Sequence, residues 1–124
     1  MSNFTHKTSV YDNGKWEEII SDTRKTHRWS FADQKGQPAV LECFQDKESL
    51  SLQFTVDGTM TRETYNGEGA LVKFEGGSVK APQSIDYADK PQKPLSIARS
   101  SILNIANRYM PSDIRKRFLT NQRH

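Results

Sequence analysis

The chain is poor in cysteine and in apolar residues, and both shortages limit what it can be. A single cysteine among 124 residues, Cys43, excludes an intrachain disulfide, and a cysteine-based zinc site is not expected. Hydrophobic residues make up 34%, which predicts a thin core, such as one sheet face covered by one or two helices. We find no apolar run of eighteen residues and no hydrophobic segment of a signal peptide. We therefore expect one soluble, cytoplasmic domain without membrane contact.

Sequence motifs of the familiar enzyme classes are missing as well. The chain has no phosphate-binding P-loop, no dinucleotide-binding glycine motif, no helical pair of metal-binding histidines and no nucleophilic serine elbow. His27 and Cys43 are expected on one sheet face, but two ligands do not make a metal site, so we interpret them as core residues. The sequence predicts a protein that is not an enzyme and has no catalytic residues, cofactor or metal.

Charge is distributed unevenly along the chain. The formal net charge is +3, from 18 Lys and Arg against 15 Asp and Glu. Residues 91–124 contain seven basic residues and only Asp113 on the acidic side, so they carry +6 and the rest of the chain carries −3. A basic C-terminal part of this kind suits nucleic acid or an acidic protein partner.

Residues 48–59 predict a strand followed by a hairpin turn. Apolar and polar residues alternate from Leu50 to Val56, which is typical of a strand with one buried and one solvated face. The pair Asp57-Gly58 favours a two-residue type I′ turn. That turn fixes the register, because it sets Leu52 opposite Glu63.

Two earlier turns extend the sheet towards the N-terminus. A turn at residues 47–48 joins the strand to the preceding one, and a three-residue turn with Gly36 in the left-handed conformation sets Trp29 opposite Leu41. Together the turns predict an antiparallel meander of five strands over about residues 26–81, with a short sixth strand around residues 78–80. They place these residues on one apolar face: Trp29, Phe31, Leu41, Cys43, Leu50, Leu52, Phe54, Val56, Tyr65, Val72 and Phe74.

The turn at residues 66–69 places a carboxylate in that apolar face. It sets Glu63 opposite Val72, and burying a carboxylate is costly unless the group is paired or protonated. We expect that a bulge or a gap in the cover leaves Glu63 in water or paired with an arginine. A raised pKa that marks a functional site is the alternative.

The C-terminal part predicts two helices. Residues 82–94 are rich in proline and read as an extended connector. A helix is expected from Leu95 to Tyr109, packed on the apolar face of the sheet, and Ser112 is expected to cap a second, short, basic helix, the two lying within residues 95–120. The apolar stripe of the first helix contains Leu95, Ala98, Ile102, Ile105, Ala106 and Tyr109.

The N-terminal part has weaker signals. Residues 1–13 lack periodicity and are expected to form a flexible arm. Trp16, Ile19 and Ile20 stand at helical spacing, which favours a short helix within residues 14–24, with a strand as the alternative. The expected fold is thus an α+β domain over residues 14–124, with a five- to six-stranded antiparallel meander.

Candidate binding residues fall into two groups. The 66–69 turn sets Arg62 opposite Lys73 on the solvated sheet face. Directly opposed like charges destabilise a sheet, so these two residues either bind a phosphate or both extend into solvent. Phe44 nearby offers a stacking surface. The second group consists of the basic residues of the C-terminal part: Arg99, Arg108, Arg115, Lys116, Arg117 and Arg123.

Short segments near the N-terminus resemble a known family. Gly14-Lys15-Trp16 resembles the Gly-x-Trp opening of lipocalin-type barrels, and residues 24–31 are similar to the stretch after that opening in cyanobacterial chromophore lyases of the same barrel class. The resemblance implies an eight-stranded barrel that holds a small ligand, such as a pigment or lipid. A meander followed by a helix also resembles single-strand-binding coactivator-like domains.

Three functions follow from these observations. The leading hypothesis is a non-catalytic module that binds nucleic acid, preferably single-stranded, through both groups of basic residues. The alternative is a protein-interaction module, such as an accessory subunit, assembly factor or inhibitor, that binds an acidic partner. A small-ligand barrel comes third, since it needs more strands than the sequence predicts. A homodimer through an exposed sheet edge is compatible with all three.

Overall fold

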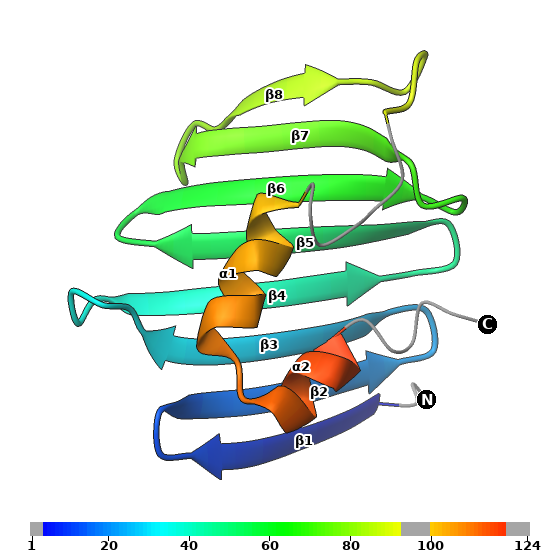
Figure 1. Ribbon diagram of the computed structural model, residues 1–124. Coiled ribbons are helices and arrows are strands. Elements are labelled where there is room, and N and C mark those ends of the chain that lie inside the picture. The colour runs from blue at the N-terminus through cyan, green and yellow to red at the C-terminus, as the bar shows by residue number, and fades with distance from the viewer. Residues whose placement is uncertain (1–3, 93–99, 119–124) are drawn as a thin grey trace.

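The computed structural model describes residues 4–92 and 100–118 and contains one sheet and two helices (Figure 1). All eight strands are antiparallel and follow each other across the sheet in chain order. Both helices lie on the same face of the sheet. The strands are β1 (Phe4–Tyr11), β2 (Gly14–Ser21), β3 (Lys25–Ala32), β4 (Pro38–Gln45), β5 (Ser49–Val56), β6 (Thr59–Asn66), β7 (Leu71–Ser78) and β8 (Gln83–Asp86); the helices are α1 (Ser101–Tyr109) and α2 (Ser112–Phe118).

The predicted α+β class and the antiparallel meander are confirmed, but the sheet has eight strands instead of five or six. Residues 4–11 of the expected flexible arm form edge strand β1. The short helix expected within residues 14–24 is wrong, because Gly14–Ser21 is strand β2. Strand β8 lies inside the expected connector, and the sixth strand expected around residues 78–80 is the end of β7 and the turn after it.

Helical spacing in β2 arises from two apolar residues on opposite faces of the sheet. Trp16 lies opposite Trp29 on the helix-covered face, whereas Ile19 lies opposite Thr26 on the other. Gly14 leaves room for the Trp29 ring, because a Cβ atom at Gly14 would lie 2.6 Å from it. The Gly-x-Trp segment therefore serves local packing in an open sheet.

The central strands have the predicted register. Asp57 and Gly58 both have positive φ angles, 51° and 75°, as a type I′ turn requires, and Leu52 lies opposite Glu63. Trp29 lies opposite Leu41, and Gly36 has a φ of 80°. Residues 34–36 form the expected three-residue loop, closed by a hydrogen bond from the Asp33 N–H to the Gln37 carbonyl.

Between β6 and β7 the register differs from the prediction. Tyr65 lies opposite Leu71 instead of Ala70, and an irregularity at Thr64/Tyr65 adds a second residue of shift, so that Glu63 lies opposite Phe74 instead of Val72. The even shift leaves Phe74 on the helix-covered face. It also sets Arg62 opposite Glu75, so the predicted pair of opposed basic residues, Arg62 and Lys73, is wrong.

The core lies between the sheet and the two helices. The hydroxyl oxygen of Ser100 accepts a hydrogen bond from the Leu103 N–H and so caps α1. Ser100 therefore precedes the helix instead of lying inside it, as a helix starting at Leu95 would require. Leu95 and Ala98 lie outside the described residues. Helix α1 crosses β5 and β6. In α2, Ile114 and Phe118 are buried. The core consists of Trp16, Trp29, Phe31, Ala39, Leu41, Cys43, Leu50, Leu52, Tyr65, Ile102, Leu103, Ala106, Met110, Ile114 and Phe118.

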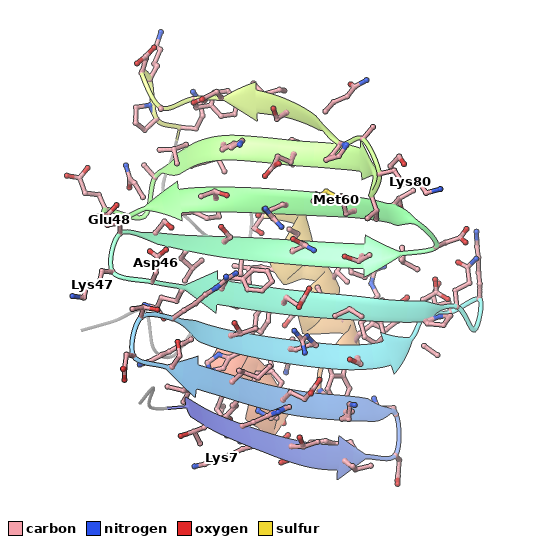
Figure 2. The ribbon with its side chains drawn as sticks, turned by 180° about the vertical axis from the view of Figure 1, so that it is seen from behind. Lys7, Asp46, Lys47, Glu48, Met60 and Lys80 are labelled. Carbon is pink, nitrogen blue, oxygen red and sulfur yellow. The ribbon has the colours of Figure 1, made fainter. Side chains whose placement is uncertain are left out.

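The face of the sheet turned away from the helices, called the open face below, is seen in Figure 2. Side chains from the strands β1 to β8 cover it, including the largely buried Met60. Most of its residues in the central strands are polar or small, such as Ser30, Ser51 and Thr55.

Candidate functional site

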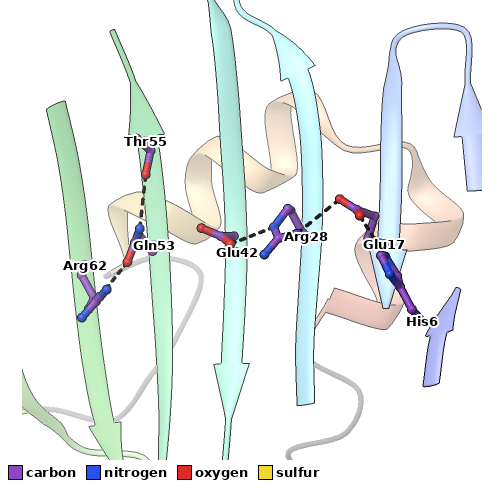
Figure 3. A network of polar contacts seen from close by, with 7 residues as sticks. All are labelled: His6, Glu17, Arg28, Glu42, Gln53, Thr55 and Arg62. Atoms are coloured by element: carbon purple, nitrogen blue, oxygen red, sulfur yellow. Dashed lines mark hydrogen bonds and ion pairs between the residues drawn. The ribbon is translucent and has the colours of Figure 1, made fainter. Parts of the chain in front are cut away.

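A row of charged and polar side chains runs across the middle of the open face, at right angles to the strands (Figure 3). The strand register sets its members opposite one another on successive strands. We call this set the charged row: Glu17, Arg28, Glu42, Gln53, Arg62 and Glu75.

Arg28 bridges two glutamates within the charged row. Its Nε donates to Glu42 Oε2 at 2.8 Å, and its Nη1 lies 3.5 Å from Glu17 Oε1. The second carboxylate oxygen of Glu17 lies 2.9 Å from His6 Nε2. Three neighbouring strands, β2, β3 and β4, are thereby linked through one guanidinium group.

Arg62 is held in a similar way. Its Nε donates to Gln53 Oε1 at 2.7 Å, and its Nη1 lies 3.6 Å from Glu75. Gln53 in turn donates to the Thr55 hydroxyl at 3.3 Å. The residue predicted to make a basic spot is therefore part of a neutral, cross-strand network.

In the charged row, the acidic side chains are less exposed to solvent than the basic ones. The glutamate side chains are 10–16% exposed, whereas those of Arg28 and Arg62 are 31% and 37% exposed. Burial by itself raises the pKa of Glu17, but the hydrogen bond from His6 and the charge of Arg28 outweigh it and hold the pKa below its usual value. The hydrogen bond from His6 and the charge of Arg28 thus favour the ionised form of Glu17, and the arginine side chains are the more exposed members of the row.

Phe44 also lies on the open face, but Arg24 covers its ring. The guanidinium carbon lies 4.5 Å from the ring centroid, a cation–π contact. A shallow groove of about 220 Å³ opens beside Arg24, between residues 21–25 and 45–47. It is lined by charges of both signs, including Lys25, Asp22 and Asp46.

The structure separates the predicted binding residues into two groups on opposite faces. Arg62, Lys73 and Phe44 lie on the open face, while Arg108, Arg115, Lys116 and Arg117 belong to the helices on the other face. Arg99 and Arg123 lie outside the described residues. No single surface of the described chain therefore brings both groups together.

Two of the helix arginines have structural partners. Arg117 forms an ion pair with Glu18 and lies over the Trp16 ring, 5.8 Å from its centroid. Arg115 donates to the carbonyl oxygen of Asn107 at 2.8 Å. These contacts attach α2 to β2 and to the end of α1.

The described part of the chain is neutral overall. Of the 18 basic residues, three lie outside it, namely Lys93, Arg99 and Arg123, and all 15 acidic residues lie within it. The described residues therefore carry 15 charges of each sign. The net charge of +3 comes from the residues outside.

Glu63 is buried, with only 5% of its surface exposed, and hydroxyl groups satisfy it instead of an arginine. Its Oε1 accepts from Ser100 at 2.6 Å and from Tyr65 at 2.9 Å, and its Oε2 lies 3.3 Å from the Ser101 hydroxyl. The expectation of a solvated or arginine-paired Glu63 is wrong. Burial first, and then the charge of Glu63, raise the pKa of Tyr65.

His27 and Cys43 are both buried and lie opposite each other, as predicted for core residues. The His27 Nδ1 donates to the Phe118 carbonyl at 3.2 Å. Burial raises the pKa of the Cys43 thiol to about 12. The His27 bond attaches the end of α2 to β3.

Sequence reasoning missed Arg28 and its two glutamates. A signal was present, because the predicted register of Trp29 with Leu41 also sets Arg28 opposite Glu42. Glu17 could not be found in this way, since β2 was expected to be helical.

Comparison with protein-family models, curated proteins and solved structures finds no match to this chain. Among residues 4–92 and 100–118, no three His, Cys, Asp or Glu side chains are grouped so that they could hold a metal ion. Neither described helix has the length and apolar character needed to cross a membrane.

Proposed function

We propose that the protein is a non-catalytic interaction module that binds an acidic protein surface through the open face. The observation that carries this proposal is the difference in exposure within the charged row, where the side chains of Arg28 and Arg62 are two to three times as exposed as those of the glutamates. An arginine has five N–H donors, so each group has donors beyond those used in the sheet. Single carboxylates of a partner are suited to accept them.

Protein binding suits this surface better than nucleic-acid binding. A nucleic-acid strand presents a continuous line of phosphates and gains affinity from cations that are not already neutralised. In the charged row, Glu17, Glu42 and Glu75 lie between and beside the arginines and would repel such a line. A protein partner places isolated acidic groups and avoids this repulsion.

Nucleic acid remains the competing prediction, and it uses another surface. Arg108 and Lys116 are exposed on the helices, on the face opposite the charged row. The two functions therefore separate by location, and substitutions on the two faces distinguish them.

Three matched Lys→Glu variants test the proposal. Lys73→Glu changes the open face, Lys116→Glu changes α2, and Lys35→Glu changes an exposed turn between β3 and β4. All three alter the net charge by the same amount. Partner capture from the native cell extract should be lost with Lys73→Glu and retained with the other two, and the captured protein should reconstitute a defined complex when purified.

Oligonucleotide titration by fluorescence anisotropy completes the test. At about 50 mM and about 200 mM salt, a nucleic-acid module binds single strands in a salt-dependent way and weakens with Lys116→Glu. That result would replace the proposed function. Equal partner binding by Lys73→Glu and Lys35→Glu would also overturn it.

A further inference from the structure

The two edges of the sheet differ in a way that favours pairing at only one of them. Strand β8 is four residues long and follows Pro82, and such short, proline-flanked edges resist pairing with other chains. Strand β1 is eight residues long, contains no proline and pairs with β2 in a continuous register. Its residues 5–10 are all exposed, and Val10 is 81% exposed.

The backbone of β1 has unpaired groups at alternate residues. The two-residue turn Asp12-Asn13 makes Tyr11 and Gly14 the last pair of the β1–β2 ladder, and in such hairpins this pair exchanges hydrogen bonds. Bonded and non-bonded pairs alternate along an antiparallel ladder. Thr8 therefore directs its N–H and C=O away from β2, along the free edge.

We propose that β1 pairs with β1 of a second copy of the chain, antiparallel, about a two-fold axis at Thr8. Each Thr8 then lies opposite the other, and Lys7 lies opposite Ser9 of the second copy. The eight-stranded sheets join into one continuous sheet with both open faces on the same side. This pairing is independent of the proposed function, because it uses the edge and not the open face.

Lys7 selects this register. In a symmetric antiparallel pair of β1 strands, the two-fold axis runs between the two copies of one residue. That residue therefore lies directly opposite itself. If that residue were Lys7, two like charges would be directly opposed, which destabilises a strand pair. An axis at Ser9 pairs fewer residues of the two strands. An axis at Thr8 pairs residues 5–11 and places no two like charges opposite each other.

The predicted dimer is weak. One pair of edge strands buries less surface than the roughly 1,200–2,000 Å² of a stable protein interface. We therefore expect a concentration-dependent equilibrium, measured by sedimentation of the full chain up to about 1 mM, where a millimolar dissociation constant is still visible. A chain that remains monomeric over this range overturns the proposal.

Proline at Thr8 tests the edge without removing a bond of the β1–β2 ladder. Because the Thr8 N–H points away from β2, Thr8→Pro should keep the circular dichroism spectrum and unfolding midpoint near those of the wild type while abolishing the dimer. A dimer that persists in folded Thr8→Pro overturns the proposal.

Cysteine cross-linking tests the register. Thr8→Cys should form a covalent dimer under mild oxidation, since opposed residues lie within disulfide reach. Ser9→Cys is the matched control, because the offset between its two copies exceeds the roughly 7 Å limit and Lys7 is retained. The native Cys43 is buried and does not interfere. Faster cross-linking of Ser9→Cys, or equal rates for both variants, overturns the Thr8-centred register.

Discussion

Ser100 donates its hydroxyl proton to the buried Glu63 carboxylate at 2.6 Å. The same hydroxyl oxygen accepts the Leu103 N–H at 3.0 Å and caps α1. One side chain thus satisfies a buried charge in the sheet and begins the helix that covers it. The first turn of α1 and strand β6 are fixed together at this point.

Replacing Ser100 with alanine should therefore cost more than the loss of an ordinary helix cap. A cap is worth about 1 kcal/mol, and a buried carboxylate that loses a donor adds about 1–2 kcal/mol. We expect a drop of about 2–3 kcal/mol in the free energy of unfolding, measured by urea denaturation. Ser101→Ala, at an exposed site with a 3.3 Å contact to Glu63, should cost less than about 1 kcal/mol. Equal losses in both variants would contradict the double role of Ser100.

His27 should make stability depend on pH below neutrality. Burial lowers its pKa from the usual 6.5, although the hydrogen bond with the Phe118 carbonyl raises it in part. Below about pH 6.5 the unfolded chain takes up a proton that the folded chain does not, so stability is present above this pH and falls as the pH decreases. The free energy of unfolding should fall by up to about 1.4 kcal/mol for each pH unit below this pH.

The measurement is the urea midpoint between pH 7.5 and 5.5 for the wild type and His27→Gln. Glutamine retains a donor for the Phe118 carbonyl but does not titrate. The variant should lose most of the slope in this range. An unchanged slope would assign the pH dependence to other groups.

Gly14 should tolerate no side chain. A Cβ atom would lie 2.6 Å from the Ser30 carbonyl oxygen and 2.6 Å from the Trp29 ring, so backbone or core must move. Gly14→Ala should destabilise the fold by about 1–3 kcal/mol or more, seen as a lower thermal midpoint. Gly67→Ala is the control, because its nearest atom is the Glu48 carbonyl oxygen at 3.8 Å. A similar midpoint for both variants would show that the Trp29 contact adapts freely.

Arg28→Ala should destabilise the fold by about 1–3 kcal/mol, since it leaves the largely buried carboxylates of Glu17 and Glu42 without their shared cation. A double-mutant cycle with Glu42→Ala measures the pairwise coupling, expected at about 0.5–1.5 kcal/mol. Arg62→Ala should cost less, because the Glu75 contact is longer, at 3.6 Å. A zero coupling between Arg28 and Glu42 would contradict the network.

The central sheet was predictable because its signals are local. Alternation in β5 and the Asp57-Gly58 turn specify strand, turn and register within a few residues, and the Gly36 turn does the same for β3 and β4. Strand β1 lacks alternation because both of its faces are exposed, so residues 5–10 resemble a loop in sequence. A bulge near Glu63 was one of two expected explanations for a carboxylate in the apolar face, but its position at Thr64/Tyr65 and the resulting register were not predicted.

The candidate site was less predictable, because its contacts join distant residues. Glu63 finds its donors at Ser100 and Ser101, almost forty residues later, and no spacing rule connects them. Arg62 was identified correctly as a residue of the solvated face, but the two-residue register shift exchanged its expected neighbour, Lys73, for Glu75. A small geometric change thus turned an expected basic spot into a neutral network.

The helices that cover the apolar face are also the last described elements to be synthesised. Trp16, Trp29 and Leu41 leave the ribosome well before Ile102 and Ile114, which complete their burial. A nascent chain that stops before residue 100 therefore carries strands with an uncovered apolar face, the kind of surface that promotes aggregation during folding. Chains terminated before residue 100 should therefore aggregate with one another and with other unfolded proteins instead of folding.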